Sequence, residues 1–159
     1  MKILGIDPGL INTGYGIIES IGSKVTLIDY GVVQPSKSEQ LSVRLKVICN
    51  DVVSIIKEFK PDVCVVEEVF YSKNFKSSLL LGKARAAVLI ASAMQGVGVE
   101  EYSARKIKQS LTGNGNSSKE QIQFMVKNIL EMNQIPKPVD ASDALAIAIC
   151  HYHHNNLLQ

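Results

Sequence analysis

The hydrophobic pattern of the first third of the chain predicts three strands. Apolar residues dominate 2–6, 15–21 and 24–33, and short turn-forming segments separate these runs. Gly22 and Ser23 fit a two-residue hairpin turn. Because the first strand carries few charges, we expect it at the centre of a sheet covered on both faces. Pro8 cannot donate a ladder hydrogen bond, so this strand should end at Asp7.

The remainder of the chain alternates helical and strand patterns. Apolar residues follow the helical period over 38–59, with Ser38 as the expected N-cap, and 63–69 is typical of a buried parallel strand. A long helix over 73–94 and a short strand over 99–102 follow. Three further helices are predicted over 104–111, 118–131 and 140–151, the first of them capped by Ser103. This order predicts one α/β domain over 1–159, with a mixed five-stranded central sheet flanked by helices.

Composition narrows the class of protein. The chain has 159 residues, of which 46% are apolar and 20% are charged, as in ordinary soluble globular proteins. No uninterrupted apolar run reaches the roughly 18 residues of a membrane helix. Cys49, Cys64 and Cys150 show no metal-binding spacing, which favours reduced, buried cysteines in a cytosolic protein. The histidines at 151, 153 and 154 are interpreted as the frayed, cationic end of the last helix.

Charge is unevenly distributed along the chain. Residues 73–119 hold eight basic and two acidic residues, a net charge of +6, whereas the flanking segments together carry −4. A surface that binds a polyanion would produce this asymmetry. Scattered lysines on a solvated face would produce the same asymmetry, and charge alone favours this interpretation over a surface that binds a polyanion.

Acidic residues stand at three places where propensity argues against them. Asp7 ends the first strand, Glu67 and Glu68 end a second buried strand, and Asp140 and Asp143 open the last helix on one face. Because consecutive strand residues point to opposite faces, only one of the two glutamates can join a common cluster. Spacing alone leaves two alternatives open, namely one metal site and a set of unrelated helix caps and strand-end acids.

A common cluster would require cations. Four converging carboxylates would repel one another at neutral pH, and some would have to be protonated. Mg²⁺ prefers oxygen ligands and also binds phosphate oxygens of a substrate. Two such ions roughly 4 Å apart can hold the attacking and leaving oxygens of a phosphodiester displacement. The metal-site alternative therefore predicts phosphodiester hydrolysis.

Four motifs follow one another along the chain, namely Gly5–Gly9 (GIDPG), Thr13–Gly16 (TGYG), Val66–Phe70 (VEEVF) and Asp140–Ala146 (DASDALA). This ordered set resembles the RuvC family of Holliday junction resolvases over essentially the whole chain. The resemblance implies a ribonuclease-H-like fold, a homodimer, and Mg²⁺-dependent, symmetric nicking of four-way DNA junctions. It implies two Mg²⁺ ions per subunit, with Mn²⁺ as a candidate substitute. It also implies cooperation with the RuvA–RuvB branch-migration complex, in the cytoplasm and without a membrane.

The resemblance also assigns roles to residues. The catalytic, metal-binding acids of the family correspond to Asp7, Glu67, Asp140 and Asp143, which decides for Glu67 over its neighbour. The acid at Glu68 departs from the family pattern, which often has a non-acidic residue there.

Residues that contact DNA are assigned in the same way. Lys108 and Lys119 correspond to family lysines implicated in DNA binding and catalysis, and Phe70 corresponds to an aromatic that stacks on a base near the junction centre. Arg105 and Lys106 are expected to join this DNA-binding surface. The plainer alternatives are solvated helix lysines and a core phenylalanine. The helix over 73–94 is the expected dimer interface.

Two other functions share part of this sequence pattern. An actin-like ATPase or sugar-kinase module also begins with a glycine-flanked aspartate, but such proteins need two domains, and this chain has length for one. A non-catalytic binder of DNA structure would use only the basic residues. In that protein, neutralising the acids would change nothing beyond stability.

Overall fold

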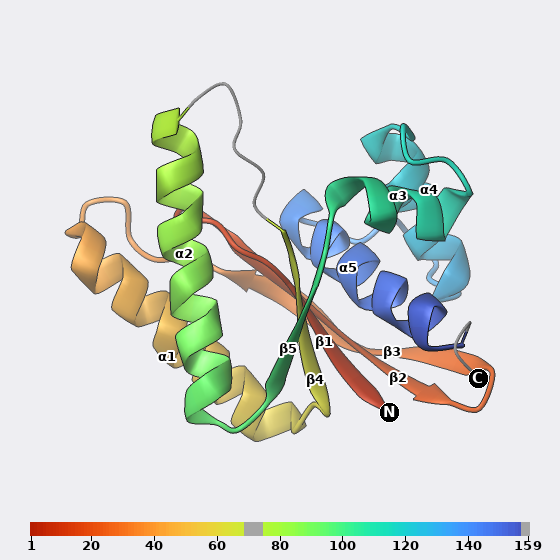
Figure 1. Cartoon of the computed structure of the whole chain (residues 1–159), viewed down its shortest axis with the longest axis horizontal. Coiled ribbons are helices and arrows are strands. Elements are labelled where there is room, and N and C mark those ends of the chain that lie inside the picture. The colour runs from red at the N-terminus through yellow and green to blue at the C-terminus, as the bar shows by residue number, and fades with distance from the viewer. Residues whose placement is uncertain (69–74, 157–159) are drawn as a thin grey trace.

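A five-stranded sheet forms the centre of the molecule, in the order β3-β2-β1-β4-β5 (Figure 1). The structure is a computed structural model, and it describes residues 1–68 and 75–156. β1 (Lys2–Asp7) pairs antiparallel with β2 (Thr13–Ile21), which pairs antiparallel with β3 (Lys24–Val33). On its other side β1 runs parallel to β4 (Val63–Glu67), and β4 runs parallel to β5 (Gly98–Tyr102). The predicted mixed sheet and the central place of the first strand are confirmed.

Helices cover both faces of this sheet. α1 (Leu41–Phe59) and α2 (Phe75–Met94) lie on one face, and α5 (Val139–Asn156) lies on the other (Figure 1). α3 (Ala104–Thr112) and α4 (Lys119–Ile129) pack on the outer side of α5. Side chains of Ser103 and Ser118 cap α3 and α4, as expected of residues that satisfy the first free backbone N–H groups.

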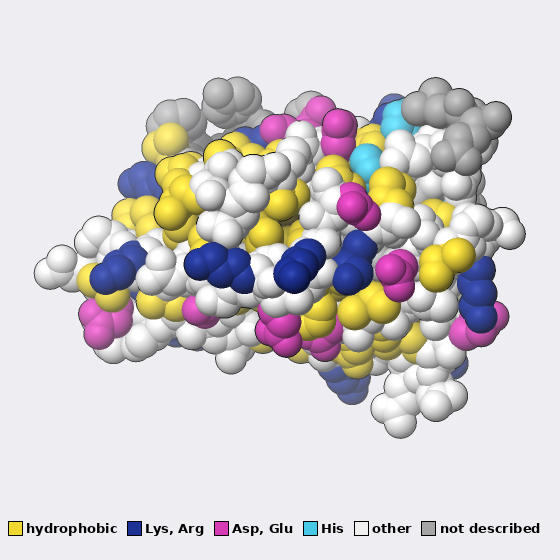
Figure 2. Space-filling model, turned by 90° about the horizontal axis from the view of Figure 1, so that it is seen from below, with side chains coloured by type: hydrophobic (Ala, Val, Ile, Leu, Met, Phe, Trp, Pro, Cys, Tyr) yellow, Lys and Arg dark blue, Asp and Glu magenta, His cyan; other side chains and the backbone are white. Residues whose placement is uncertain are grey.

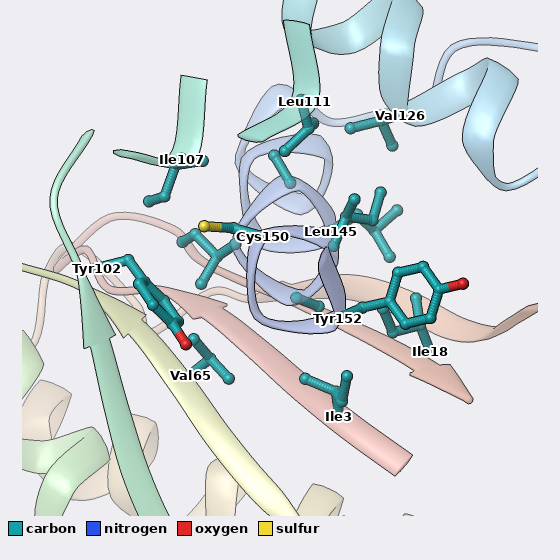
Figure 3. Close-up of a cluster of buried hydrophobic side chains, with 14 of the residues drawn as sticks. Ile3, Ile18, Val65, Tyr102, Ile107, Leu111, Val126, Leu145, Cys150 and Tyr152 are labelled. Atoms are coloured by element: carbon teal, nitrogen blue, oxygen red, sulfur yellow. The ribbon is translucent and has the colours of Figure 1, made fainter. Parts of the chain in front are cut away.

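The alternation of strand residues divides the core into two clusters. Ile3 and Val65 are fully buried on the side of α5, in the cluster that Figure 3 shows, which also contains Leu145. Their chain neighbours Leu4 and Val66 are buried in the cluster on the side of α1 and α2. Side chains along a strand point in the same direction at every second residue. The last residues of β1 and β4 lie four and two positions after Ile3 and Val65, so they too point toward α5.

α5 lies unusually close to the sheet because glycines face it. A Cβ atom on Gly5 would stand 2.1 Å from the carbonyl oxygen of Ala144, and one on Gly14 would stand 2.0 Å from the carbonyl oxygen of Asp140. Both distances are far below van der Waals contact, so only glycine fits. Gly14 is also the register partner of Asp7. The first turn of α5 is therefore held directly beside the end of β1.

The start of α1 differs from the prediction. The helix begins at Leu41, and its N-cap is Gln40, which makes no capping hydrogen bond with its side chain. The Ser38 hydroxyl instead lies 2.8 Å from the Ser36 hydroxyl, in a turn where the N–H of Glu39 donates to the carbonyl of Ser36. The serine prediction was wrong because this local turn competes with the helix for the same hydroxyl group.

The interpretation of the C-terminal histidines was wrong for His151, whereas His153 and His154 lie in the last turn of α5 as predicted. α5 continues to Asn156, and His151 is only 5% exposed. Its Nδ1 lies 2.9 Å from the hydroxyl of Tyr102, and its Nε2 lies 3.0 Å from the side-chain nitrogen of Asn155. Burial lowers the pKa of His151, so this ring is a neutral core residue and not a charged helix end.

α2 has one buried side and one exposed apolar side. Ala84 and Val88 are fully buried, and Arg85 forms an ion pair with Glu101 of β5. By length and mean hydropathy, Lys76–Met94 is also the one helix in the described part of the chain that could cross a membrane. Because one side belongs to the core and Arg85 is paired with β5, we interpret α2 as a helix of a globular domain.

Candidate active site

The ends of β1 and β4 place two carboxylates side by side. Ile6 pairs with Val66 in the parallel ladder, so the next residues, Asp7 and Glu67, are neighbours at the carboxyl edge of the sheet. The side chains of Asp7 and Glu67 both point toward α5. Glu68 lies beyond the end of the strand, where its backbone N–H donates to the carbonyl of Tyr102. The alternation of the strand thus agrees with the choice of Glu67 as the site residue.

A pocket opens at this edge between the sheet, α3, α4 and α5. Its volume is about 300 Å³, and its charged lining consists of Asp7, Glu67, Asp143, Lys108 and Lys119. Apolar side chains of α3, α4 and α5 complete the wall, among them those at 107, 122 and 147. Carboxylates therefore line the side formed by β1, β4 and α5, and ammonium groups line the side formed by α3 and α4.

Asp140 belongs to the same electrostatic cluster but does not line the pocket. Its charge acts on Asp7, together with the charges of Asp143 and Glu67. Its Oδ2 accepts a hydrogen bond of 3.1 Å from the side-chain nitrogen of Asn12. The structure therefore brings all four predicted acids together around the end of β1, although three contribute to the pocket wall.

The cluster strongly disfavours negative charge on Asp7. Burial and, after it, the negative charges of Asp143, Glu67 and Asp140 raise the pKa of Asp7 to about 7, while Lys119 opposes the shift. Burial and Asp143 likewise raise the pKa of Glu67, against the opposing charges of Lys119 and Lys108. Such an arrangement is stabilised by either a proton or a cation.

One cation is already supplied by the protein. The Nζ of Lys119 lies 3.0 Å from Oδ2 of Asp143, and this hydrogen bond raises the pKa of Lys119. The Lys119 side chain is 67% exposed, whereas that of Asp143 is 23% exposed. The ammonium group therefore reaches in from the solvent side of α4 to neutralise one acid of the cluster.

The donor set fits hard divalent cations. Four carboxylates supply only oxygen ligands, which Mg²⁺ and Mn²⁺ prefer. Burial, followed by the charges of the other three acids, raises the pKa of Asp7, so a bound cation would stabilise its ionised form. Within the described residues, no three Asp, Glu, His or Cys side chains stand close enough to form a finished metal-binding group. Three of the acids thus supply suitable oxygen ligands along one side of the pocket.

The predicted DNA-binding residues do not all lie in one place. Lys108 and Lys119 line the pocket, but Nζ of Lys106 stands 4.6 Å from the centre of the Tyr102 ring, on another side of α3. Arg105 packs beside Gly115. Phe70 lies outside the described residues. On the face shown in Figure 2, acidic side chains lie among the basic ones, so the structure does not extend the basic character over that face.

The raised pKa of Asp7 predicts how stability depends on pH. Asp7 titrates near pH 7 in the folded protein and near 3.8 when unfolded, so between these values the folded protein alone keeps the proton. The free energy of unfolding of metal-free protein should therefore fall as pH rises from about 4 to 7, by up to about 4 kcal/mol. Urea unfolding in EDTA at several pH values measures this loss.

The matched control for this prediction is Asp7→Asn, which cannot titrate. Its stability should be less dependent on pH over the same window. Added Mg²⁺ should restore the stability of the unchanged protein at pH 8. Identical pH profiles for the two proteins would show that Asp7 does not carry the effect.

Comparisons with known proteins agree with this geometry. The sequence profile of the family "Crossover junction endodeoxyribonuclease RuvC" matches residues 3–151. The chain belongs to the RuvC family. The RuvC crossover junction endodeoxyribonuclease of Caldicellulosiruptor saccharolyticus is 46% identical over 152 residues, which are 95% of this chain and 92% of that protein. The RuvC of Desulforamulus reducens is 46% identical over 151 residues, again 95% of this chain and 93% of the relative.

Solved structures of RuvC proteins are similar as well. The structure of Thermus thermophilus RuvC in complex with a Holliday junction substrate superimposes with a TM-score of 0.93 at 34% identity, covering 99% of this chain and 96% of that one. The yeast mitochondrial Holliday junction resolvase Ydc2, at 18% identity and a TM-score of 0.71, shares the fold. These matches confirm the predicted ribonuclease-H-like α/β architecture and favour a nuclease over the ATPase module or the non-catalytic binder. Nucleases of the RuvC family depend on a metal ion.

Proposed function

We propose that this protein is a Holliday junction resolvase that hydrolyses one phosphodiester bond in each of two opposing strands of a four-way DNA junction. The observation that carries the proposal is the pocket between Asp7, Glu67 and Asp143 on one side and Lys108 and Lys119 on the other. It combines ligands for divalent cations with positive groups for a phosphate. Membership of the RuvC family supplies the substrate class.

In this proposal the four acids hold two Mg²⁺ ions, for which Mn²⁺ can substitute. Bound there, the ions would activate water and neutralise charge on the reacting phosphate. Asp7 and Glu67 provide ligands from the rigid end of the sheet, and Asp140 and Asp143 provide them from the first turns of α5. Because glycines let α5 lie directly on β1 and β2, these two sets of ligands are fixed relative to one another.

The lysines act on the opposite wall of the pocket. Lys108 comes from α3 and Lys119 from the first position of α4, and both line the pocket with the acids, where Lys119 already contacts Asp143. Positive groups in this place attract the DNA backbone and stabilise negative charge that develops as the P–O bond breaks. A metal ion bound by Asp143 would compete with the Lys119 ammonium group for that carboxylate.

A synthetic four-way junction tests the function directly. Incubation with the protein and Mg²⁺ should give paired nicks at symmetric positions in opposing strands, with ends that a ligase can rejoin. Linear duplex of the same sequence should stay intact. Binding of the junction without any Mg²⁺- or Mn²⁺-dependent cutting would overturn the proposal in favour of a non-catalytic binder.

Two symmetric cuts require two active sites, and the proposal therefore includes a homodimer. The exposed side of α2 is the proposed interface, because Leu79, Ile90 and Met94 are 49%, 55% and 66% exposed and share one side of the helix by its period. Such a stripe on a helix whose other side is buried suits contact with a second copy.

Ile90→Glu should convert this dimer into a monomer. A carboxylate buried in an apolar interface without a partner costs several kcal/mol, so the dimer should weaken by at least about 100-fold. Sedimentation velocity over a range of protein concentrations measures the change, with Val43→Glu, at an exposed position of α1, as the matched control. A dimer unaffected by Ile90→Glu would place the interface elsewhere, and a monomeric unchanged protein would contradict the dimer itself.

The proposal also includes a cytoplasmic location and cooperation with the RuvA–RuvB branch-migration complex. Both rest on membership of the RuvC family and on the chemistry of the substrate. Reduced Cys64 and Cys150 in the core agree with the location.

A further inference from the structure

Two side-chain amides connect Asp140 to the far edge of the sheet. Nε2 of Gln34 donates to Oδ1 of Asn12 over 2.9 Å, and Nδ2 of Asn12 donates to Oδ2 of Asp140 over 3.1 Å. Asn12 lies in the turn between β1 and β2, and Gln34 directly follows β3. Three segments that are distant in sequence thus meet in one chain of hydrogen bonds.

The direction of this chain follows from chemistry. A carboxylate only accepts hydrogen bonds, so the Asn12 atom that faces Asp140 must be the amide nitrogen. The amide oxygen of Asn12 is then left for Gln34, whose own nitrogen must face it. Gln34 thereby prevents the Asn12 amide from turning over, and Asn12 presents a fixed donor to Oδ2 of Asp140.

The turn that carries Asn12 is itself fixed. The hydroxyl of buried Thr13 donates to the carbonyl of Gly9 over 2.8 Å and accepts from the Gly9 N–H over 3.2 Å. The Arg44 guanidinium donates to the carbonyl of Leu10. Asn12 therefore stands in a turn whose backbone is tied to itself and to α1, directly after the strand that ends at Asp7.

Asp140 and Asp143 consequently have different partners. Asp143 is held by the exposed ammonium group of Lys119, whereas Asp140 is held by a neutral amide in the turn between β1 and β2. An amide donor occupies one carboxylate oxygen and leaves the other free. Hydrogen bonds of this kind orient carboxylates toward bound metal ions, and losing them costs 10- to 100-fold in metal affinity.

We propose that Asn12, supported by Gln34, is a positioning residue that sets the orientation of the Asp140 carboxylate for metal binding. The inference rests on the proposed metal-dependent function. It assigns a role to a residue that none of the sequence motifs singled out, and it links the turn beside Asp7 to the first turn of α5.

Binding of Mn²⁺ alone, followed by electron paramagnetic resonance of the free ion, tests this role without any activity. Asn12→Ala should weaken Mn²⁺ binding about 10-fold, and Gln34→Ala should weaken it about 3-fold, since the Asn12 amide remains but can rotate. Asn50→Ala, an exposed asparagine on α1, is the matched control and should bind as the unchanged protein does.

Cleavage kinetics provide the second readout. At saturating Mg²⁺, Asn12→Ala should cut the junction at nearly the normal rate, but half-maximal rate should require about 10-fold more Mg²⁺. A merely structural role would lower the thermal stability in EDTA and leave the metal requirement unchanged. Should Asn12→Ala fail to fold, the same test can be made with Gln34→Ala, because Gln34 is the exposed end of this chain of hydrogen bonds.

Failure of this inference differs from failure of the proposed function. If Asp140→Asn loses Mn²⁺ binding while Asn12→Ala and Gln34→Ala bind normally, the positioning role is wrong and the nuclease proposal stands. If Asp140→Asn binds Mn²⁺ and cuts the junction as the unchanged protein does, the proposed metal site itself is wrong.

Discussion

Asp7→Asn should bind a four-way junction as tightly as the unchanged protein and cut it at least about 10³-fold more slowly. The substitution keeps the size of the side chain but removes a carboxylate that we propose as a metal ligand, at the centre of the cluster, where Asp7 interacts with Asp143, Glu67 and Asp140. Loss of several kcal/mol of charge stabilisation in the transition state corresponds to such a factor. Single-turnover cleavage in Mg²⁺, with a gel-shift assay in Ca²⁺, separates cutting from binding.

The control for this experiment is Asp51→Asn, which removes an exposed carboxylate from α1. It changes the net charge equally and should cut at the normal rate. Asp7→Asn should also unfold at a higher temperature than the unchanged protein in EDTA at pH 8, because it relieves repulsion in the cluster. A variant that cuts normally would exclude Asp7 from the reaction.

Lys119→Met should slow cleavage about 10²-fold at saturating Mg²⁺ and, at the same time, strengthen Mn²⁺ binding by the DNA-free protein. The first effect follows from the loss of a positive group beside the scissile phosphate. The second follows because the ammonium group, 3.0 Å from Asp143, no longer competes with the ion for that carboxylate. Cleavage rates and Mn²⁺ titrations measure the two effects separately.

Lys127→Met, at the other end of α4, is the matched control because it removes the same charge from the same helix. It should leave both the rate and the Mn²⁺ affinity unchanged. Equal slowing by the two substitutions would mean that Lys119 contributes only to the general attraction of DNA. Weaker Mn²⁺ binding by Lys119→Met would contradict its competition with the ion.

The position of the acids could be predicted from the sequence to different degrees. Pro8 and the apolar run before it were enough to end β1 at Asp7, and helical spacing placed Asp140 and Asp143 on one face. The strand pattern could not decide whether Glu67 or Glu68 belongs to the site. The alternation of side chains along a strand shows which residues share a face of the sheet, but it does not show which face holds the site. The pairing of Ile6 with Val66 supplies that information, and it is a tertiary contact.

The sequence already indicated that the basic residues of α3 point to different sides of the helix. Lys106 and Lys108 are two positions apart on a helix, which separates their side chains by about 200°. They could not both face the pocket, and the structure places Lys106 over Tyr102 instead. Treating the basic segment as one DNA-binding surface overlooked the helical period.

The partners of the acids could not be predicted. The hydrogen bond from Asn12 to Asp140 joins residues 128 positions apart, and that from Lys119 to Asp143 depends on how α4 packs against α5. Neither residue type is unusual where it stands, since asparagine is common in turns and lysine is common on helices. Only the close approach of α5 to the sheet brings these groups within reach of one another.

Anomalous diffraction from crystals grown with Mn²⁺ tests the central claim most directly, namely that the acids at the ends of β1, β4 and α5 bind divalent ions together. We predict two anomalous peaks in the pocket, with carboxylate oxygens of the four acids as their ligands. Saturating Mn²⁺ that leaves the space between Asp7 and Asp143 without a peak would contradict it.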